Sequence, residues 1–139
     1  MFDIENYVID YIQTAYENAG MSVHVDSMLQ SYPSEFPSIT VREVQNVSLD
    51  STRDDSLEEH HVSVRYQIDI IVAEKPIKAN CKRLMAIADR AMQDLKFTRT
   101  DCDLSASEDR TLAWGTLVYR AVVGEPRTVG DNQIYQMYR

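Results

Sequence analysis

The residues that come closest to a reactive set are two adjacent histidines with acidic side chains near them in the sequence. His60 and His61 follow a group of acidic residues, namely Asp54, Asp55, Glu58 and Glu59. Imidazole and carboxylate groups are common metal ligands. However, the histidines begin a predicted strand, in which neighbouring side chains point to opposite faces of a sheet. They cannot easily share one ion, so we expect no metal site here.

The cysteines show no sign of nucleophilic chemistry. Cys81 falls in a helical pattern and Cys102 in a polar stretch, and no neighbour in the sequence marks either as a nucleophile. A free thiol in a helical pattern usually belongs to the core. Because 2 cysteines are too few for a disulfide scaffold, we expect both to remain thiols.

The glycines do not gather into a phosphate-binding loop, because the chain has only 4 and they lie far apart, at Gly20, Gly115, Gly124 and Gly130. Carboxylates are plentiful, but no pair stands out by apolar surroundings. We therefore expect no catalytic residue, no cofactor and no enzyme activity. A small-molecule enzyme is the least favoured alternative, and it would be recognised by a deep apolar pocket.

The charge distribution argues against nucleic acid as the main partner. The formal net charge is −8, whereas phosphate binding needs clustered Lys and Arg. Residues 1–74 hold 14 acidic and 3 basic side chains, whereas residues 75–139 hold 8 acidic and 11 basic side chains. If these halves form opposite flanks, identical copies attract head to tail. If the halves interleave in space, the asymmetry averages out.

No segment predicts secretion or insertion into a membrane. The residues from Met1 to Glu5 are acidic where a signal peptide is basic, and no apolar run approaches the length of a membrane span. We expect a protein that works in cytosol-like water and has no membrane partner.

One strand pattern organises the chain, in the segment from His61 to Glu74. Apolar or aromatic side chains recur there at every second position, at Val62, Val64, Tyr66, Ile68, Ile70 and Val72. In an extended chain these side chains leave the same face, and mostly polar residues take the other. The pattern predicts a long central strand with one buried face.

Helical periodicity appears on both sides of this strand. The first helix is expected to run for about sixteen residues, with Asp3 as its N-cap and Gly20 as its C-terminal stop. Its tyrosines, Tyr7, Tyr11 and Tyr16, fall on the apolar stripe and are expected to face the core. The second helix is expected from Ile77 to Leu95, with Lys78, Lys82, Arg83 and Arg90 on its polar side. Because acidic residues are mixed in, that side is typical of a solvated face or a subunit contact.

The other strands are shorter or less regular. Met21 to Val25 favours a short edge strand, and a strand pattern that begins at Ser38 slips in phase between Glu43 and Asn46, which predicts a bulge. A polar strand is expected from Phe97 to Leu104, and a final strand from Thr111 to Val123. The final strand is apolar on both faces and so needs cover on both sides, from helices or from a neighbouring subunit.

Together these elements predict an α+β fold, a mainly antiparallel twisted sheet with the two amphipathic helices packed on one face. The polar stretch between the second and third strand patterns predicts a long protruding β-hairpin. Residues 1–124 form one domain, and residues 125–139 form a C-terminal tail that is either frayed or an arm that docks on a partner.

The order of motifs resembles the tail-terminator, or tail-completion, proteins of long-tailed bacteriophages, together with related neck and minor tail proteins. The resemblance covers roughly residues 4–124. It rests on the N-terminal helix, the Tyr32-Pro33 to Phe36-Pro37 approach into Ser38-Ile39-Thr40-Val41, the loop 50–57, the strand from Arg65 to Ile70, the helix ending in Ala91 to Phe97, and Val118-Tyr119-Arg120 in the last strand. None of these is a catalytic signature.

The resemblance implies a structural protein of the virion that forms a homohexameric ring in the tail-neck region after assembly in the host cytoplasm. Such a ring caps the tail tube, ends its polymerisation and offers the surface on which the head docks. The implied partners are further copies of the chain, the tail tube protein and a head-neck connector protein, while DNA passes through the lumen without specific binding. The interface candidates that follow are Asp50, Arg53, Asp54, Asp55 and Glu58 in the hairpin, and Lys78, Lys82, Arg83 and Arg90 on the second helix.

One alternative shares this fold. A head-completion or connector protein would meet the portal side of the neck rather than the tail tube. Mixing with tube protein separates the two functions, because only a terminator halts tube growth at substoichiometric amounts.

Overall fold

A computed structural model of the chain describes residues 4–28, 35–48 and 61–124, together with the backbone of three short C-terminal strands. The elements, in chain order, are α1 (Glu5–Asn18), β1 (Val25–Asp26), β2 (Ser38–Ser48), β3 (His61–Val72), α2 (Ile77–Asp94), β4 (Thr98–Ala106), β5 (Ala113–Gly124), β6 (Arg127–Val129), β7 (Asn132–Ile134) and β8 (Met137–Tyr138). None of the described helices is long and apolar enough to cross a membrane.

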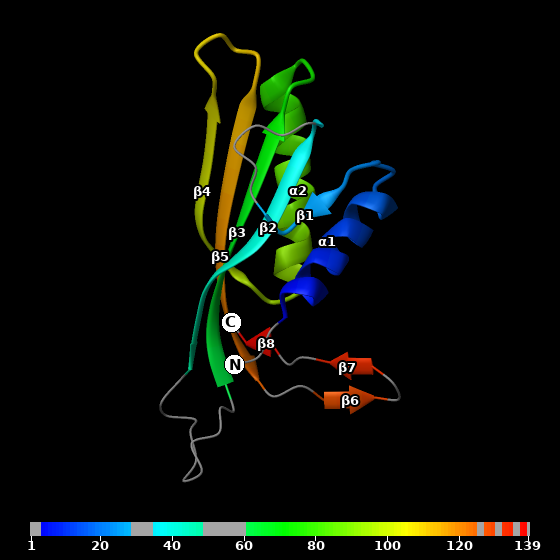
Figure 1. The fold of residues 1–139 in the computed structure, drawn as a ribbon, viewed down its shortest axis with the longest axis vertical. Coiled ribbons are helices and arrows are strands. Elements are labelled where there is room, and N and C mark those ends of the chain that lie inside the picture. Colours follow the sequence, from blue (N-terminus) through cyan, green and yellow to red (C-terminus); the bar gives the residue numbers. More distant parts are fainter. Residues whose placement is uncertain are drawn as a thin grey trace.

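The strands form one twisted mixed sheet in the order β1-β2-β3-β5-β4, in which β1 runs parallel to β2 and the longer strands pair antiparallel. β8 adds to the end of β5, and β6 and β7 pair with each other. Both helices lie on the same side of the sheet (Figure 1), with α1 against β1 and β2 and α2 against β3, β4 and β5. The predicted α+β fold with helices on one face is confirmed.

β3 lies between β2 and β5, and its helix-facing side is buried as the alternating pattern predicts. Val62, Val64, Tyr66, Ile68, Ile70 and Val72 are at most 2% exposed. These side chains are the centre of the core, because α2 packs on β3 and β5 from that side. The Tyr66 ring meets the Phe97 ring edge to face, with centroids 5.5 Å apart.

The predicted irregularity in β2 is present as a shift of register between Glu43 and Gln45. At this bulge the backbone N–H of Glu43 donates a hydrogen bond of 3.1 Å to the Glu5 carboxylate, in the first turn of α1. This hydrogen bond ties the outer edge of β2 to the start of the first helix.

α1 ends where the sequence predicts, because Gly20 takes a φ of +76° and Met21 donates its N–H to the Tyr16 carbonyl. The prediction for the tyrosines is correct only for Tyr16, which is fully buried and donates its hydroxyl to the Leu84 carbonyl over 2.7 Å. Tyr7 and Tyr11 are each 37% exposed. These two rings remain on the outer edge of the apolar stripe of α1.

α2 follows the predicted range almost residue for residue and lies close against β5. The close approach depends on Gly115, because a Cβ at this position would overlap Met85 and press on Cys81. Further along α2, the Asp89 carboxylate accepts a hydrogen bond of 2.6 Å from the Tyr119 hydroxyl of β5. It also forms an ion pair of 3.3 Å with Arg99 of β4. Burial and this hydrogen bond raise the pKa of Tyr119 above its usual value.

Two predicted features lie partly or wholly outside the described residues. β2 and β3 are antiparallel partners, but the connection over 49–60 is not described, so the protruding hairpin stays a prediction. Within the predicted C-terminal tail, Met137 and Tyr138 pair with Val123 and Val122 of the same chain. This part of the tail extends the protein's own sheet.

Candidate assembly surface

The side of the sheet that points away from α1 and α2 carries no described helix (Figure 1), and we call it the uncovered face. Strand register and side-chain alternation place a mixed set of residues on it. They are Thr40, Arg42, Gln45 and Val47 of β2, Ser63, Arg65, Gln67, Asp69 and Ile71 of β3, and Trp114, Thr116, Val118, Arg120 and Val122 of β5.

Asp69 lies at the centre of the uncovered face and is nevertheless only 2% exposed. Its Oδ1 accepts hydrogen bonds of 3.1 Å from the Trp114 indole N–H and from the Thr116 hydroxyl. The Gln67 amide donates to Asp69 at 3.2–3.3 Å, and a guanidinium nitrogen of Arg42 lies 3.8 Å from Oδ2. A carboxylate on a sheet face stays buried only when donors replace its water; Trp114, Thr116 and Gln67 supply the hydrogen bonds and Arg42 a positive charge.

The Asp69 network fixes the orientation of Trp114, the single tryptophan of the chain. Its ring is 37% exposed although its N–H points inward to the carboxylate. An aromatic side chain that is both exposed and held in one orientation loses little entropy when a partner covers it. Trp114 therefore has the properties of an anchor residue in an interface.

Arg65 and Arg120 are direct cross-strand partners on the uncovered face, and both are exposed. Like charges opposite each other on adjacent strands destabilise a sheet. Among the residues that the structure describes, neither guanidinium has an ion pair or hydrogen bond. On the neighbouring strand β4, Asp101 lies opposite Val118 and not opposite Arg120. Its carboxylate accepts a hydrogen bond from the backbone N–H of Cys102. The arginine pair is thus an uncompensated positive site.

The interface candidates from the sequence stay predictions, because the structure describes only those on α2. Asp50, Arg53, Asp54, Asp55 and Glu58 lie outside the described residues. Lys78, Lys82, Arg83 and Arg90 are all exposed on α2. Lys78 lines a hollow with Ala106 and Arg110, whereas Arg83 lines a pocket beside Met21 on the α1 side.

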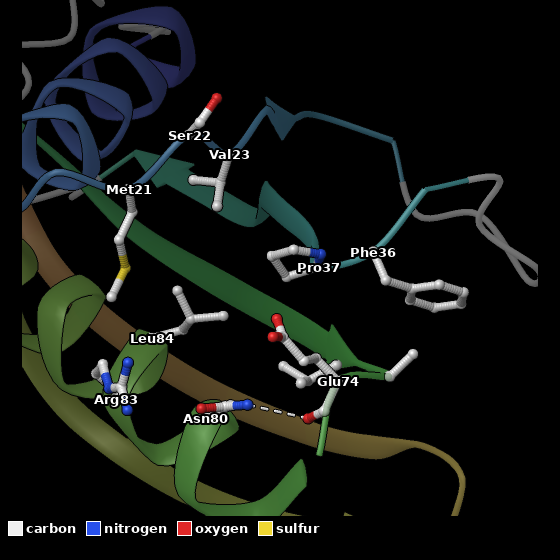
Figure 2. Close-up of a pocket in the computed structure, with 11 residues that line it drawn as sticks. Met21, Ser22, Val23, Phe36, Pro37, Glu74, Asn80, Arg83 and Leu84 are labelled. Carbon is white, nitrogen blue, oxygen red and sulfur yellow. Dashed lines mark hydrogen bonds between the residues drawn. The ribbon is translucent and has the colours of Figure 1, made fainter. Parts of the chain in front are cut away.

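That pocket lies between the segment after α1, the start of β2 and the first turns of α2, and has a volume of about 220 Å³. Figure 2 shows Met21 and Leu84 on one side of it and Pro37 on another, with the Asn80 amide donating to the Glu74 carbonyl over 3.0 Å. Small-molecule sites usually measure roughly 300–1,000 Å³. The hollow at Lys78 is larger, about 840 Å³, but is lined by only six residues at the molecular surface.

No group of three or more potential metal ligands occurs in the part of the chain that the structure describes. Of the histidine pair, His61 begins β3, while His60 and the acidic residues before it lie outside that part. The predicted opposite orientation of the two histidines therefore stays a prediction.

The two cysteines differ sharply in their surroundings. Cys81 is fully buried under β5, and Cys102 is exposed on the edge strand β4; both are free. Burial raises the pKa of the Cys81 thiol to about 11, and a hydrogen bond with the Gly115 backbone only partly offsets this. Because the thiolate is the nucleophile, Cys81 is chemically inert near neutral pH.

We expect a thiol reagent at pH 8 to modify Cys102 within minutes and Cys81 only after unfolding. The reagent absorbance should show one fast equivalent per chain in buffer and two in denaturant. The native state favours the protonated Cys81 thiol, so the stability that this group contributes is complete below its unfolded pKa and is lost as the pH rises from about 9 towards about 11. Two fast equivalents in buffer would contradict the buried position of Cys81.

Sequence reasoning did not identify the residues that make this surface, which are Asp69, Trp114 and the arginine pair. The available signals were an acidic residue on the mainly polar parity of the central strand and the apolar residues on both faces of the last strand. On the side away from the helices Trp114 is exposed and Val118 and Val122 are partly shielded, so the cover that the second signal predicts there stays a prediction.

No protein-family model matches the chain, and a search of curated proteins finds no match either.

Proposed function

We propose that the protein is a structural subunit of a bacteriophage tail. Copies of the chain form a ring that caps the tail tube, ends its polymerisation and provides the surface for head docking. The observation that carries the proposal is the uncovered face, which combines an oriented, exposed tryptophan with an uncompensated arginine pair. This face is suited to contact with another protein. The resemblance in motif order to tail-terminator proteins favours a tail protein as the class to which the chain belongs.

The energetics of this face favour association. Trp114 and Val47 are 37% and 44% exposed, and partly shielded Val118 and Val122 lie beside them. Aromatic residues and arginine are enriched at protein interfaces, where they supply most of the binding energy. A partner that covers the tryptophan and brings carboxylates to the arginines removes both unfavourable features of the free subunit.

A ring also agrees with the charge of the chain. Contacts between two different surfaces of identical subunits close into rings when the rotation between the surfaces permits it. The net charge of −8 is opposite to that of a DNA-binding protein and would let DNA pass through a lumen without adhesion.

The test is the mass of the protein alone and in the presence of purified tail tubes, by light scattering followed by negative-stain imaging. A terminator forms rings of about six copies, or caps tube ends, and stops tube growth at substoichiometric amounts. A ring that leaves tube length unchanged would assign the protein to the connector side of the neck. A monomer that ignores tubes would overturn the proposal.

A further inference from the structure

The outer side of α1 carries a stripe with charge opposite to that of the arginine pair. Tyr7, Asp10, Tyr11 and Thr14 recur at helical spacing along one flank of α1, at the edge of its apolar stripe, and all four are exposed. The charged residues of α1 are Glu5, Asp10 and Glu17, without a single basic residue. Asp10 has no hydrogen bond or ion pair within the described residues, and a tyrosine flanks it at each of positions 7 and 11.

The acidic stripe on α1 and the uncovered face match in two respects. The first is charge, because within the described residues the Asp10 carboxylate and the Arg65 and Arg120 guanidinium groups have no partner of opposite charge. The second is aromatic character, because the stripe exposes two tyrosine rings within one helical turn of Asp10. Guanidinium groups bind carboxylates and also stack on aromatic rings, so a tyrosine–aspartate–tyrosine stripe suits an arginine pair on both counts.

From this complementarity we propose that the uncovered face is the docking site for α1 of a second copy of the chain, with Asp10 of one copy paired to Arg65 and Arg120 of the next. The proposal rests on the proposed function, because it names the contact by which copies join.

The position of the two surfaces dictates the symmetry of the contact. α1 packs on one side of the sheet (Figure 1), whereas strand register and side-chain alternation place the arginine pair on the opposite side. One rigid copy therefore cannot satisfy its own arginines, and two copies related by a two-fold axis cannot form both contacts at once. The association is head to tail, with one stripe and one uncovered face left over at each end until a ring closes.

The edge strand β4 limits where α1 can lie. Asp101 and Asp103 are placed on the same side of the sheet as the arginines, opposite Val118 and Thr116. They would repel the acidic stripe, since like charges across an interface cost several kcal/mol. The docked helix therefore lies over β2, β3 and β5, where Arg42, Arg65 and Arg120 are the cations.

Charge reversal on either surface tests the proposal. The first variant carries Asp10→Arg, and the second carries both Arg65→Glu and Arg120→Glu. Each should raise the concentration at which half the chains assemble by at least about thirtyfold. A mixture of these two proteins should assemble again, because every helix then meets a face of opposite charge. The triple variant that carries all three changes should also assemble. Asp94→Arg, an exposed reversal on α2, is the matched control and should assemble like the natural chain.

Light scattering and the emission of Trp114 report the outcome, since a docked helix shields the indole and shifts its emission to shorter wavelength. Circular dichroism establishes that each variant is folded. Assembly that survives reversal of either surface, or that fails to return in the mixture, would overturn this contact while leaving the ring itself in place. Assembly that follows the charge pattern but does not cap tubes would overturn the proposed function and retain the contact. A natural chain that remains monomeric at every concentration, with and without tubes, would overturn both.

Discussion

Tyr66→Asp should leave the protein unable to fold. Tyr66 is fully buried at the middle of β3, and its ring packs edge to face on Phe97. Its hydroxyl reaches the Glu43 carboxylate at 3.3 Å, so an aspartate here would lose the ring contact and place a second carboxylate near the first. The expected loss is about 5 kcal/mol or more, which equals or exceeds the total stability of many domains.

The measurement is a urea titration followed by circular dichroism, with Tyr66→Phe as the control. Phenylalanine keeps the packing against Phe97 and removes only the hydroxyl, so it should cost about 1 kcal/mol. A soluble Tyr66→Asp protein with a cooperative transition would show that this face of β3 is not the core face.

Asp69→Ala should lower the free energy of unfolding by about 3 kcal/mol, because it leaves several donors without their acceptor. The indole N–H of Trp114 and the hydroxyl of Thr116 both donate to Asp69, and the Arg42 guanidinium lies 3.8 Å away. Removal of the carboxylate also releases the Trp114 ring. The emission of this single tryptophan should therefore shift to longer wavelength in the folded variant.

Asp69→Asn is the matched control for the loss of the carboxylate. Its amide oxygen can still accept from Trp114 and Thr116, so the stability loss should be about 1 kcal/mol and the emission should change little. Denaturant unfolding followed by both fluorescence and circular dichroism measures the two effects. Equal losses for the alanine and asparagine variants would mean that the negative charge, rather than the hydrogen bonds, is what the site requires.

These two variants separate the folding core from the candidate assembly surface. Tyr66 and Asp69 lie three residues apart on the same strand, yet they face opposite sides of the sheet. The first side is covered by helices of the same chain. The second is held in shape by a buried polar network, so Asp69→Ala should weaken assembly more than its stability loss alone would suggest, because Trp114 and Arg42 lose their fixed positions.

The overall fold was predictable from the sequence because its signals are local. Alternation of apolar side chains from Val62 to Val72 specifies a strand and its buried face, and a spacing of three and four specifies α2. The phase slip in β2 was also visible, because a bulge changes which parity is apolar. Each of these patterns is a consequence of backbone geometry and does not depend on what lies across the sheet.

The fate of the tyrosines on α1 was not predictable in this way. Tyr7, Tyr11 and Tyr16 all fall on or near the apolar stripe, but only Tyr16 reaches the core, where it meets Leu84 of α2. How much of a helix is covered depends on the width of the groove between its neighbours. That width is set by α2 and β2, which are distant in the sequence.

Periodicity within single segments predicts the α+β class, the central strand, the two helices and the inner face of the sheet. What the other face contains depends on how the strands pair. Strand register brings Arg65 opposite Arg120, and it brings Trp114 and Thr116 to Asp69 across 45 and 47 positions of the chain. Cross-strand partners are fixed by register and turn length, which no local period encodes, so the candidate assembly surface appears only when the strands are paired.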